Sequence, residues 1–138
     1  MIRLAVALMV AAAPASAQIV PLTFESGKSL ALAAGQWTHA ASASGSEARY
    51  GTHIALRCDR ATRTVTIYRP IAPDSSLTIT TSELTRALPV GGRLLANDPL
   101  LDAMAFSRGR FLVSDGSGPA LAVPSWPEAA RSIEDCRI

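Results

Sequence analysis

Apolar and polar side chains alternate most strictly between His53 and Arg69. Alternation with a period of two is typical of β-strands that bury one face. A turn at residues 59–62 would join two such strands into a hairpin and pair Leu56 with Val65, so that both strands bury the same face. The sequence therefore predicts a hairpin with one side in the core.

The polar side of this hairpin carries the most suggestive group of side chains. The expected register places His53 opposite Tyr68 and Arg57 opposite Thr64, all pointing away from the core. This donor-rich platform could bind a polar or anionic partner. Thr and Tyr are also common on the solvent side of strands, so an ordinary exposed face remains the alternative. His53, Arg57 and Tyr68 are the first candidate binding residues.

Shorter runs bounded by Gly, Pro and Ser predict further strands. They cover residues 36–41, 47–51, 76–81, 83–88, 110–114 and 120–123. The pattern of residues 93–96 is ambiguous. The chain therefore predicts a mainly antiparallel sheet of about six to eight strands.

A short helix is expected before the last hairpin. Asn97-Asp98-Pro99 supplies a cap and a proline at the first helical position, and apolar residues follow at helical spacing until Gly109. Arg108 and Arg110 flank the end of this helix and form a second pair of candidate binding residues. Helix capping and compensation of the helix dipole are the alternative roles for these two cations.

A second helix is expected at the C-terminal end. Ser125 and Glu128 fit the S-x-x-E capping box, which marks a helix start. Apolar residues then recur at spacings of three and four, namely Trp126, Ala129, Ile133 and Cys136. This stripe would place Cys136 on the inner face of the helix.

Cys58 and Cys136 are the two cysteines of the chain. In an exported protein a pair of cysteines predicts one disulfide, while an intermolecular bridge or two free thiols remain open. Alternation places Cys58 on the inner face of its strand, and helical spacing does the same for Cys136. The disulfide would therefore fasten the C-terminal helix across the sheet.

Together these elements predict an α+β fold. It consists of the antiparallel sheet, the short helix before the last hairpin, and the C-terminal helix with its disulfide link to the sheet. We expect residues 18–35 to form an extended N-terminal arm and residues 36–138 to form a single disulfide-stapled globular domain.

Residues 1–17 have the three parts of a signal peptide. The basic start Met1-Ile2-Arg3 is followed by an apolar run to Ala13 and by Ala15-Ser16-Ala17, which fits an A-x-A cleavage site. The run is too short to span a membrane, and a buried N-terminal helix is the alternative. Cleavage would leave Gln18 first, in a periplasmic or secreted protein without a transmembrane segment.

Few residues have the spacing of known catalytic or metal-binding motifs. The chain contains no G-x-S-x-G pentapeptide, and the predicted disulfide removes both thiols as nucleophiles. His39 and His53 are too few for a typical zinc site, and His39 is expected to pack on the face of Trp37. The sequence therefore predicts no metal and no cofactor.

Charged residues point to no particular chemistry. Glu47 or Glu83 together with Asp59 could act as paired carboxylates in glycoside hydrolysis, but their spacing does not select them. With 13 basic and 11 acidic residues, the chain lacks the excess of positive charge typical of nucleic-acid binding.

Two stretches carry resemblances. Residues 98–111, with 124–128 and 134–137, resemble a group of small uncharacterised exported proteins of Gram-negative bacteria, which implies an exported protein and no defined activity. Residues 42–50 are similar to the Ser-Gly and Tyr loop of periplasmic C-type lysozyme inhibitors. Downstream the chain departs from that family, because the Lys-bearing segment is missing and the cysteine strand comes in a different order.

These observations favour a non-enzymatic binding or accessory module over an enzyme. We expect a monomer that binds another protein or an envelope component, as an inhibitor or a subunit of an envelope complex would. The alternative is a small hydrolase acting on an envelope polymer. A deep pocket with converging acids would favour the hydrolase, whereas a shallow exposed sheet would favour the binding module.

Overall fold

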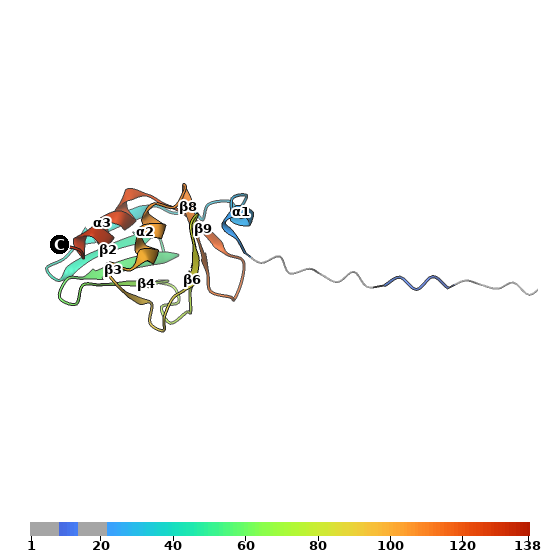
Figure 1. The fold of residues 1–138 in the computed structure, drawn as a ribbon, viewed down its shortest axis with the longest axis horizontal. Helices are drawn as coiled ribbons and strands as arrows, with labels where there is room; N and C mark the ends of the chain where they lie inside the picture. Colours follow the sequence, from blue (N-terminus) through green and yellow to red (C-terminus); the bar gives the residue numbers. More distant parts are fainter. Residues whose placement is uncertain (1–8, 14–21) are drawn as a thin grey trace, which may run out of the picture.

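The computed structural model describes residues 9–13 and 22–138. Residues 9–13 belong to no helix or strand, and the cleavage site predicted after Ala17 lies outside the described residues. From Leu22 onward the chain forms the helices and strands drawn in Figure 1.

Nine strands in the described part of the chain form two antiparallel sheets. The first sheet has the order β1-β2-β3-β4-β7, with β1 (Trp37–Ala41), β2 (Gly45–Tyr50), β3 (Ile54–Asp59), β4 (Thr64–Tyr68) and β7 (Arg93–Leu95). The second has the order β6-β5-β8-β9, with β5 (Thr78–Thr80), β6 (Thr85–Ala87), β8 (Arg110–Ser114) and β9 (Leu121–Pro124). The helices are α1 (Phe24–Gly27), α2 (Pro99–Ala105) and α3 (Pro127–Asp135).

This architecture confirms the predicted α+β fold. Helix α2 directly precedes the β8-β9 hairpin, and α3 follows it. There is one strand more than expected, because residues 93–95, which were ambiguous in sequence, pair with β4 as β7. Asp98 caps α2 as predicted, since its Oδ1 accepts a hydrogen bond from the Leu100 N–H at 2.9 Å.

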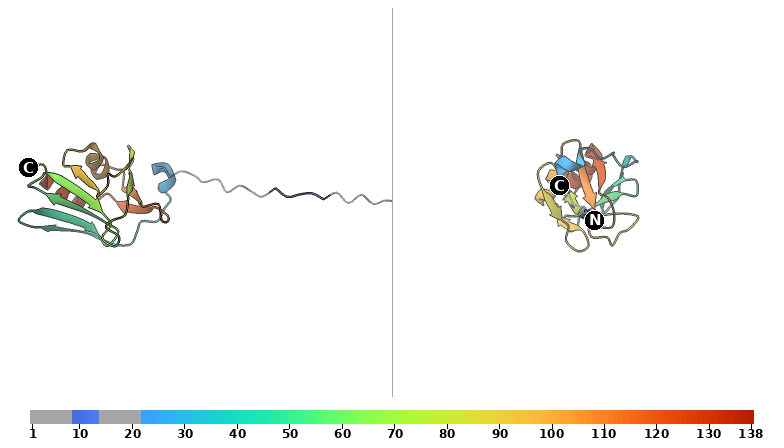
Figure 2. Two further views of the ribbon diagram at one scale, coloured as in Figure 1. Left: turned by 90° about the horizontal axis from the view of Figure 1, so that it is seen from below. Right: turned by 90° about the vertical axis from the view of Figure 1, so that its right-hand side faces the viewer.

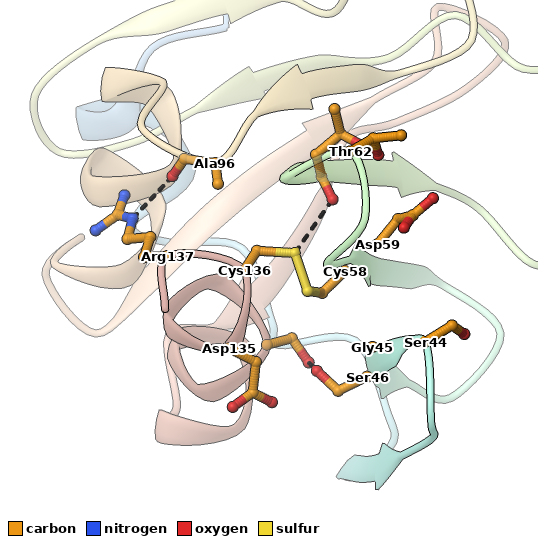
Figure 3. The surroundings of a disulfide bond; sticks show 12 residues. Ser44, Gly45, Ser46, Cys58, Asp59, Thr62, Ala96, Asp135, Cys136 and Arg137 are labelled. Atoms are coloured by element: carbon orange, nitrogen blue, oxygen red, sulfur yellow. Dashed lines mark hydrogen bonds between the residues drawn. A yellow bond between two sulfur atoms is a disulfide. The ribbon is translucent and has the colours of Figure 1, made fainter.

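Helix α3 packs against one face of the first sheet, across β1, β2 and β3. Ile133 is fully buried on this side of the helix, and the Ser46 hydroxyl on β2 donates to Ser132 Oγ at 3.2 Å. Cys136, at the end of α3, forms the predicted disulfide with Cys58 on β3, and their Cα atoms are 5.6 Å apart (Figure 3). The disulfide therefore fastens the C-terminal helix to the sheet.

The β3-β4 hairpin has the predicted faces but a different register. Leu56 lies opposite Ile67, whereas the sequence pattern had suggested Val65. The connecting loop spans residues 60–63, and Arg63 ends it with a positive φ of 50°. Because the shift in pairing is an even number of residues, every inner side chain stays inside.

The start of α3 differs from the prediction. Trp126 is the N-cap residue and makes no capping hydrogen bond with its side chain, and Pro127 is the first helical residue. Among the described residues, Ser125 Oγ and Glu128 Oε2 have no hydrogen-bond partner, so the predicted capping box is wrong. The Ser125 N–H donates to the Gly109 carbonyl at 3.3 Å, which ties Ser125 to the start of β8. Trp126 is half-exposed and does not belong to the buried stripe.

Residues 22–35 run from α1 along the second sheet. Helix α1 is a single turn capped by Thr23, which the sequence pattern did not predict. Leu32 forms an isolated parallel bridge with Ala122 on β9, and the Ala33 N–H donates to the Ala122 carbonyl at 2.8 Å. This segment therefore covers part of the exposed edge of β9.

Candidate functional site

The side of the first sheet that points away from α3 is called the outer face here. Ser46 on β2 and Cys58 on β3 contact α3, so their strand neighbours Glu47 and Arg57 point to the opposite side. In Figure 2 (left) the green strands β2 to β4 form one side of the molecule, and no described helix covers it. Its central side chains are Glu47, Arg49, Arg57, Thr66, Tyr68 and Arg93.

Four of these side chains form a hydrogen-bonded group, the Glu47 cluster, which consists of Glu47, Arg49, Arg57 and Tyr68. Glu47 accepts hydrogen bonds from Arg49 Nε, from Arg57 Nε at 2.9 Å and from the Tyr68 hydroxyl at 3.0 Å. The Tyr68 hydroxyl in turn accepts from Arg49 Nη2 at 3.1 Å and from Arg57 Nη2 at 2.8 Å. The carboxylate and the phenol are thus shared between both guanidinium groups.

The order of strands brings the Glu47 cluster together. Glu47 on β2 lies directly opposite Arg57 on β3. Ala55 on β3 lies between Arg49 on β2 and Tyr68 on β4. The side chain of Ala55 is small, so Arg49 and Tyr68 can meet across it, and the cover they provide explains why Ala55 is fully buried on an exposed face.

The electrostatics of the Glu47 cluster hold it in its charged form. Partial burial alone would raise the pKa of Glu47, but the hydrogen bonds from Arg49, Arg57 and Tyr68 outweigh it and lower the pKa below its usual value. Hydrogen bonding to Glu47 raises the pKa of Arg57, whose guanidinium carbon also lies 4.9 Å from the centre of the Tyr68 ring. The cluster is therefore an ordered ion-pair network.

The structure brings together two of the three predicted residues of this face, Arg57 and Tyr68. The expected pairing of His53 with Tyr68 is wrong, because Ala55 lies opposite Tyr68. His53 precedes β3, and its Nε2 lies 3.1 Å from the Ala34 carbonyl oxygen, near the N-terminal segment.

Sequence reasoning missed Glu47 and Arg49 as members of the site. Part of the signal was in the sequence, because Glu47 and Arg49 alternate with Ser46, Ala48 and Tyr50, which the structure buries, and this alternation puts both charged residues on one face of β2.

The two residues of the second predicted pair, Arg108 and Arg110, make contacts with different parts of the chain. Arg110 Nη1 donates to the carbonyl oxygens of Leu30 at 2.6 Å and Gly27 at 3.3 Å, so this side chain holds the N-terminal segment. Arg108 is exposed, and its backbone N–H donates to Ser82 Oγ at 3.2 Å.

A groove of about 380 Å³ lies beside the Glu47 cluster, and Glu47, Arg57 and Asp59 line it. Glu47 and Asp59, two of the three acids considered for hydrolysis, thus share one groove, and Glu83 does not line it. The Glu47 carboxylate already accepts the hydrogen bonds from Arg49, Arg57 and Tyr68. Asp59 Oδ1 accepts a hydrogen bond from the Ala61 N–H at 3.0 Å. The lowered pKa of Glu47 makes this carboxyl a poor proton donor, whereas glycoside hydrolysis needs a general acid with a raised pKa.

Other predicted features can be located in the structure. His39 is packed on the inner face as expected, and its Nε2 lies 3.2 Å from Asp135 Oδ2.

Within residues 9–13 and 22–138, no group of three or more His, Cys, Asp or Glu side chains could hold a metal ion. In the same residues no helix is long and apolar enough to cross a membrane.

Comparisons with protein-family models, with curated proteins and with solved structures find no match for this chain. Its function is therefore inferred from the geometry of the outer face.

Proposed function

We propose that this chain is a non-enzymatic binding module of the periplasm or the extracellular medium. It holds another protein or an envelope component on its outer face, as an inhibitor or a subunit of an envelope complex would. The Glu47 cluster carries this proposal, because it presents arginine and tyrosine side chains in a fixed arrangement on an open sheet. Tyr and Arg are enriched among the residues that dominate binding energies.

The disulfide supports the proposed location. A disulfide between two buried cysteines forms and persists in an oxidising compartment, which agrees with the signal peptide expected at residues 1–17. The groove beside the cluster supports a binding module better than a hydrolase, because its acids Glu47 and Asp59 already accept hydrogen bonds from other groups of the chain.

The test is capture of a partner by variants with matched charge. The purified chain is immobilised and exposed to periplasmic extract of the organism that encodes it, and bound material is identified, purified and titrated back by calorimetry. A face variant, Arg57→Glu/Arg93→Glu, should weaken binding at least tenfold. The control Arg108→Glu/Arg131→Glu changes two exposed arginines elsewhere by the same charge and should bind within twofold of the original chain.

Two outcomes would contradict the proposal. Equal binding by the face variant and the original chain would exclude the outer face as the binding surface. Release of soluble fragments from an envelope polymer, abolished by Glu47→Gln, would show that the chain is a hydrolase.

A further inference from the structure

The two guanidinium groups of the Glu47 cluster are oriented by the same partners. Each uses its Nε and Nη2 atoms for Glu47 and the Tyr68 hydroxyl. Among the described residues neither Nη1 has a hydrogen-bond partner, and both arginine side chains are about half-exposed. The cluster therefore fixes two arginines while leaving one end of each available to a ligand.

The charge of the outer face is positive around this cluster. Arg93 on β7 lies across Thr66 from Arg57, so three arginines on this face stand against two carboxylates, those of Glu47 and of Asp59 at the end of β3. Arg93 is exposed. A partner surface that carries negative charge would therefore be complementary.

Glu47 itself indicates which negative group fits. Its carboxylate lies between the Nε atoms of Arg49 and Arg57, one oxygen to each. Each arginine thus already pairs with a carboxylate oxygen through its Nε, and the planar guanidinium fork, which matches carboxylate geometry, can bind a second carboxylate at its free end. Tyr68 and the exposed Leu95 add aromatic and apolar area beside the charges, as protein interfaces do.

We propose that the outer face recognises an acidic protein surface, with an Asp or Glu side chain of the partner bound by the free Nη1 ends of the two prearranged arginines Arg49 and Arg57. This inference rests on the proposed function and names the chemistry of the partner. Because Glu47 and Tyr68 already hold the guanidinium groups in place, binding a partner carboxylate orders little that is free beforehand. Tyr68 acts here as a positioning residue.

The experiment uses a capped hexaglutamate peptide as the probe. The peptide is titrated into the ¹⁵N-labelled full chain at low salt, and the signals of the arginine Nε–H groups are followed by NMR. We expect saturable shifts at Arg49 and Arg57 and binding at least tenfold weaker in Arg49→Gln/Arg57→Gln. A capped hexaglutamine peptide should cause no shift, and the control Arg108→Gln/Arg131→Gln should bind hexaglutamate within twofold.

Two further variants test the prearrangement. Arg49→Lys/Arg57→Lys keeps the charge but loses the fork, and Tyr68→Phe keeps the ring but loses the hydroxyl that both Nη2 atoms contact. Each should weaken hexaglutamate binding at least threefold in a chain that remains folded by circular dichroism. Binding equal to that of the original chain in both variants would overturn the inference, because net charge alone would then account for it.

The remaining outcomes separate this inference from the proposed function. If sodium triphosphate shifts the two arginines at lower concentration than hexaglutamate, the face recognises phosphate-bearing polymers and the inference is wrong. If hexaglutamate fails to bind while the capture experiment still finds a partner that depends on Arg57, the proposed function stands and this inference falls. If capture is insensitive to the face variant, the proposed function falls as well.

Discussion

Removal of the disulfide is the change whose effect can be worked most directly from the structure. The bond joins residues 78 positions apart, and in the chain-entropy model a loop of this length stabilises the folded state by about 4.5 kcal/mol. Cys58→Ala/Cys136→Ala leaves two buried small side chains and no buried charge. We expect the free energy of unfolding to fall by roughly 3 to 5 kcal/mol, a large part of the usual 5 to 15 kcal/mol.

Urea unfolding followed by circular dichroism, with linear extrapolation, measures this loss. The matched control is Ser46→Ala/Ser132→Ala, which removes a buried hydrogen bond between α3 and the sheet but leaves the chain cross-linked. Since both hydrogen-bonding partners are removed together, its cost should stay within about 1 kcal/mol. Amide exchange should become faster in α3 of the cysteine variant and remain slow in that of the control.

If the free energy of unfolding of the cysteine variant falls by less than about 1 kcal/mol, the reasoning is refuted. The disulfide would then not stabilise the fold by lowering the entropy of the unfolded chain. The disulfide lies on the inner side of the sheet, whereas the Glu47 cluster lies on the outer face. Partner binding by the folded fraction of the cysteine variant should therefore equal that of the original chain.

Three further changes have defined outcomes. Gly92→Ala should lower the free energy of unfolding, measured in urea, by at least about 3 kcal/mol, because the added Cβ would lie 2.1 Å from the Ile67 carbonyl oxygen. Gly91→Ala is the control. Its Cβ would meet no other atom, so it should lower the same free energy by only the roughly 1 to 2 kcal/mol of a left-handed backbone. Asp98→Ala should lower the unfolding free energy by about 1 kcal/mol through loss of the α2 cap, measured in the same way. Because the pKa of Glu47 is lower in the folded chain than in the unfolded chain, the ionised Glu47 side chain stabilises the fold. This contribution is fully present above the pKa of Glu47 in the unfolded chain and is lost as the pH falls through its pKa in the folded chain. The difference in thermal midpoint between the original chain and Glu47→Gln should therefore be largest near neutral pH and shrink below about pH 4.5.

Local sequence patterns were reliable for the faces of the strands and for α3 itself, whereas Trp126, which helical spacing had placed on the buried stripe, precedes the helix and is half-exposed. Alternation alone determined which side of β3 and β4 is buried, since a strand has only two faces. Alternation placed Cys58 on the inner side of β3, and helical spacing placed Cys136 on the inner side of α3. The disulfide between them confirms both predictions. The cap at Asp98 is equally local, because its acceptor and the helical N–H groups lie within three residues.

The pattern failed where no turn residue marks the local conformation, and where the answer depends on groups far away in the sequence. The turn after β3 ends with Arg63 in a left-handed conformation, and neither Gly nor Asn marks that position, so loop length and register could not be read. Ser125 fits a capping box, yet its backbone is bound to Gly109, which only the packing of β8 against β9 brings near.

The candidate site shows the same division. The sequence by itself determined that Arg57 and Tyr68 face solvent, because side chains along a strand point alternately to its two sides. Only the tertiary structure decided that Glu47 and Arg49 join them, since the lateral order β2-β3-β4 sets which strands are neighbours. It also decided that Arg110 holds the N-terminal segment, because its carbonyl partners lie some 80 residues earlier in the chain. Alternation fixes the side of a sheet to which a residue points, whereas strand order and chain packing fix what it meets there.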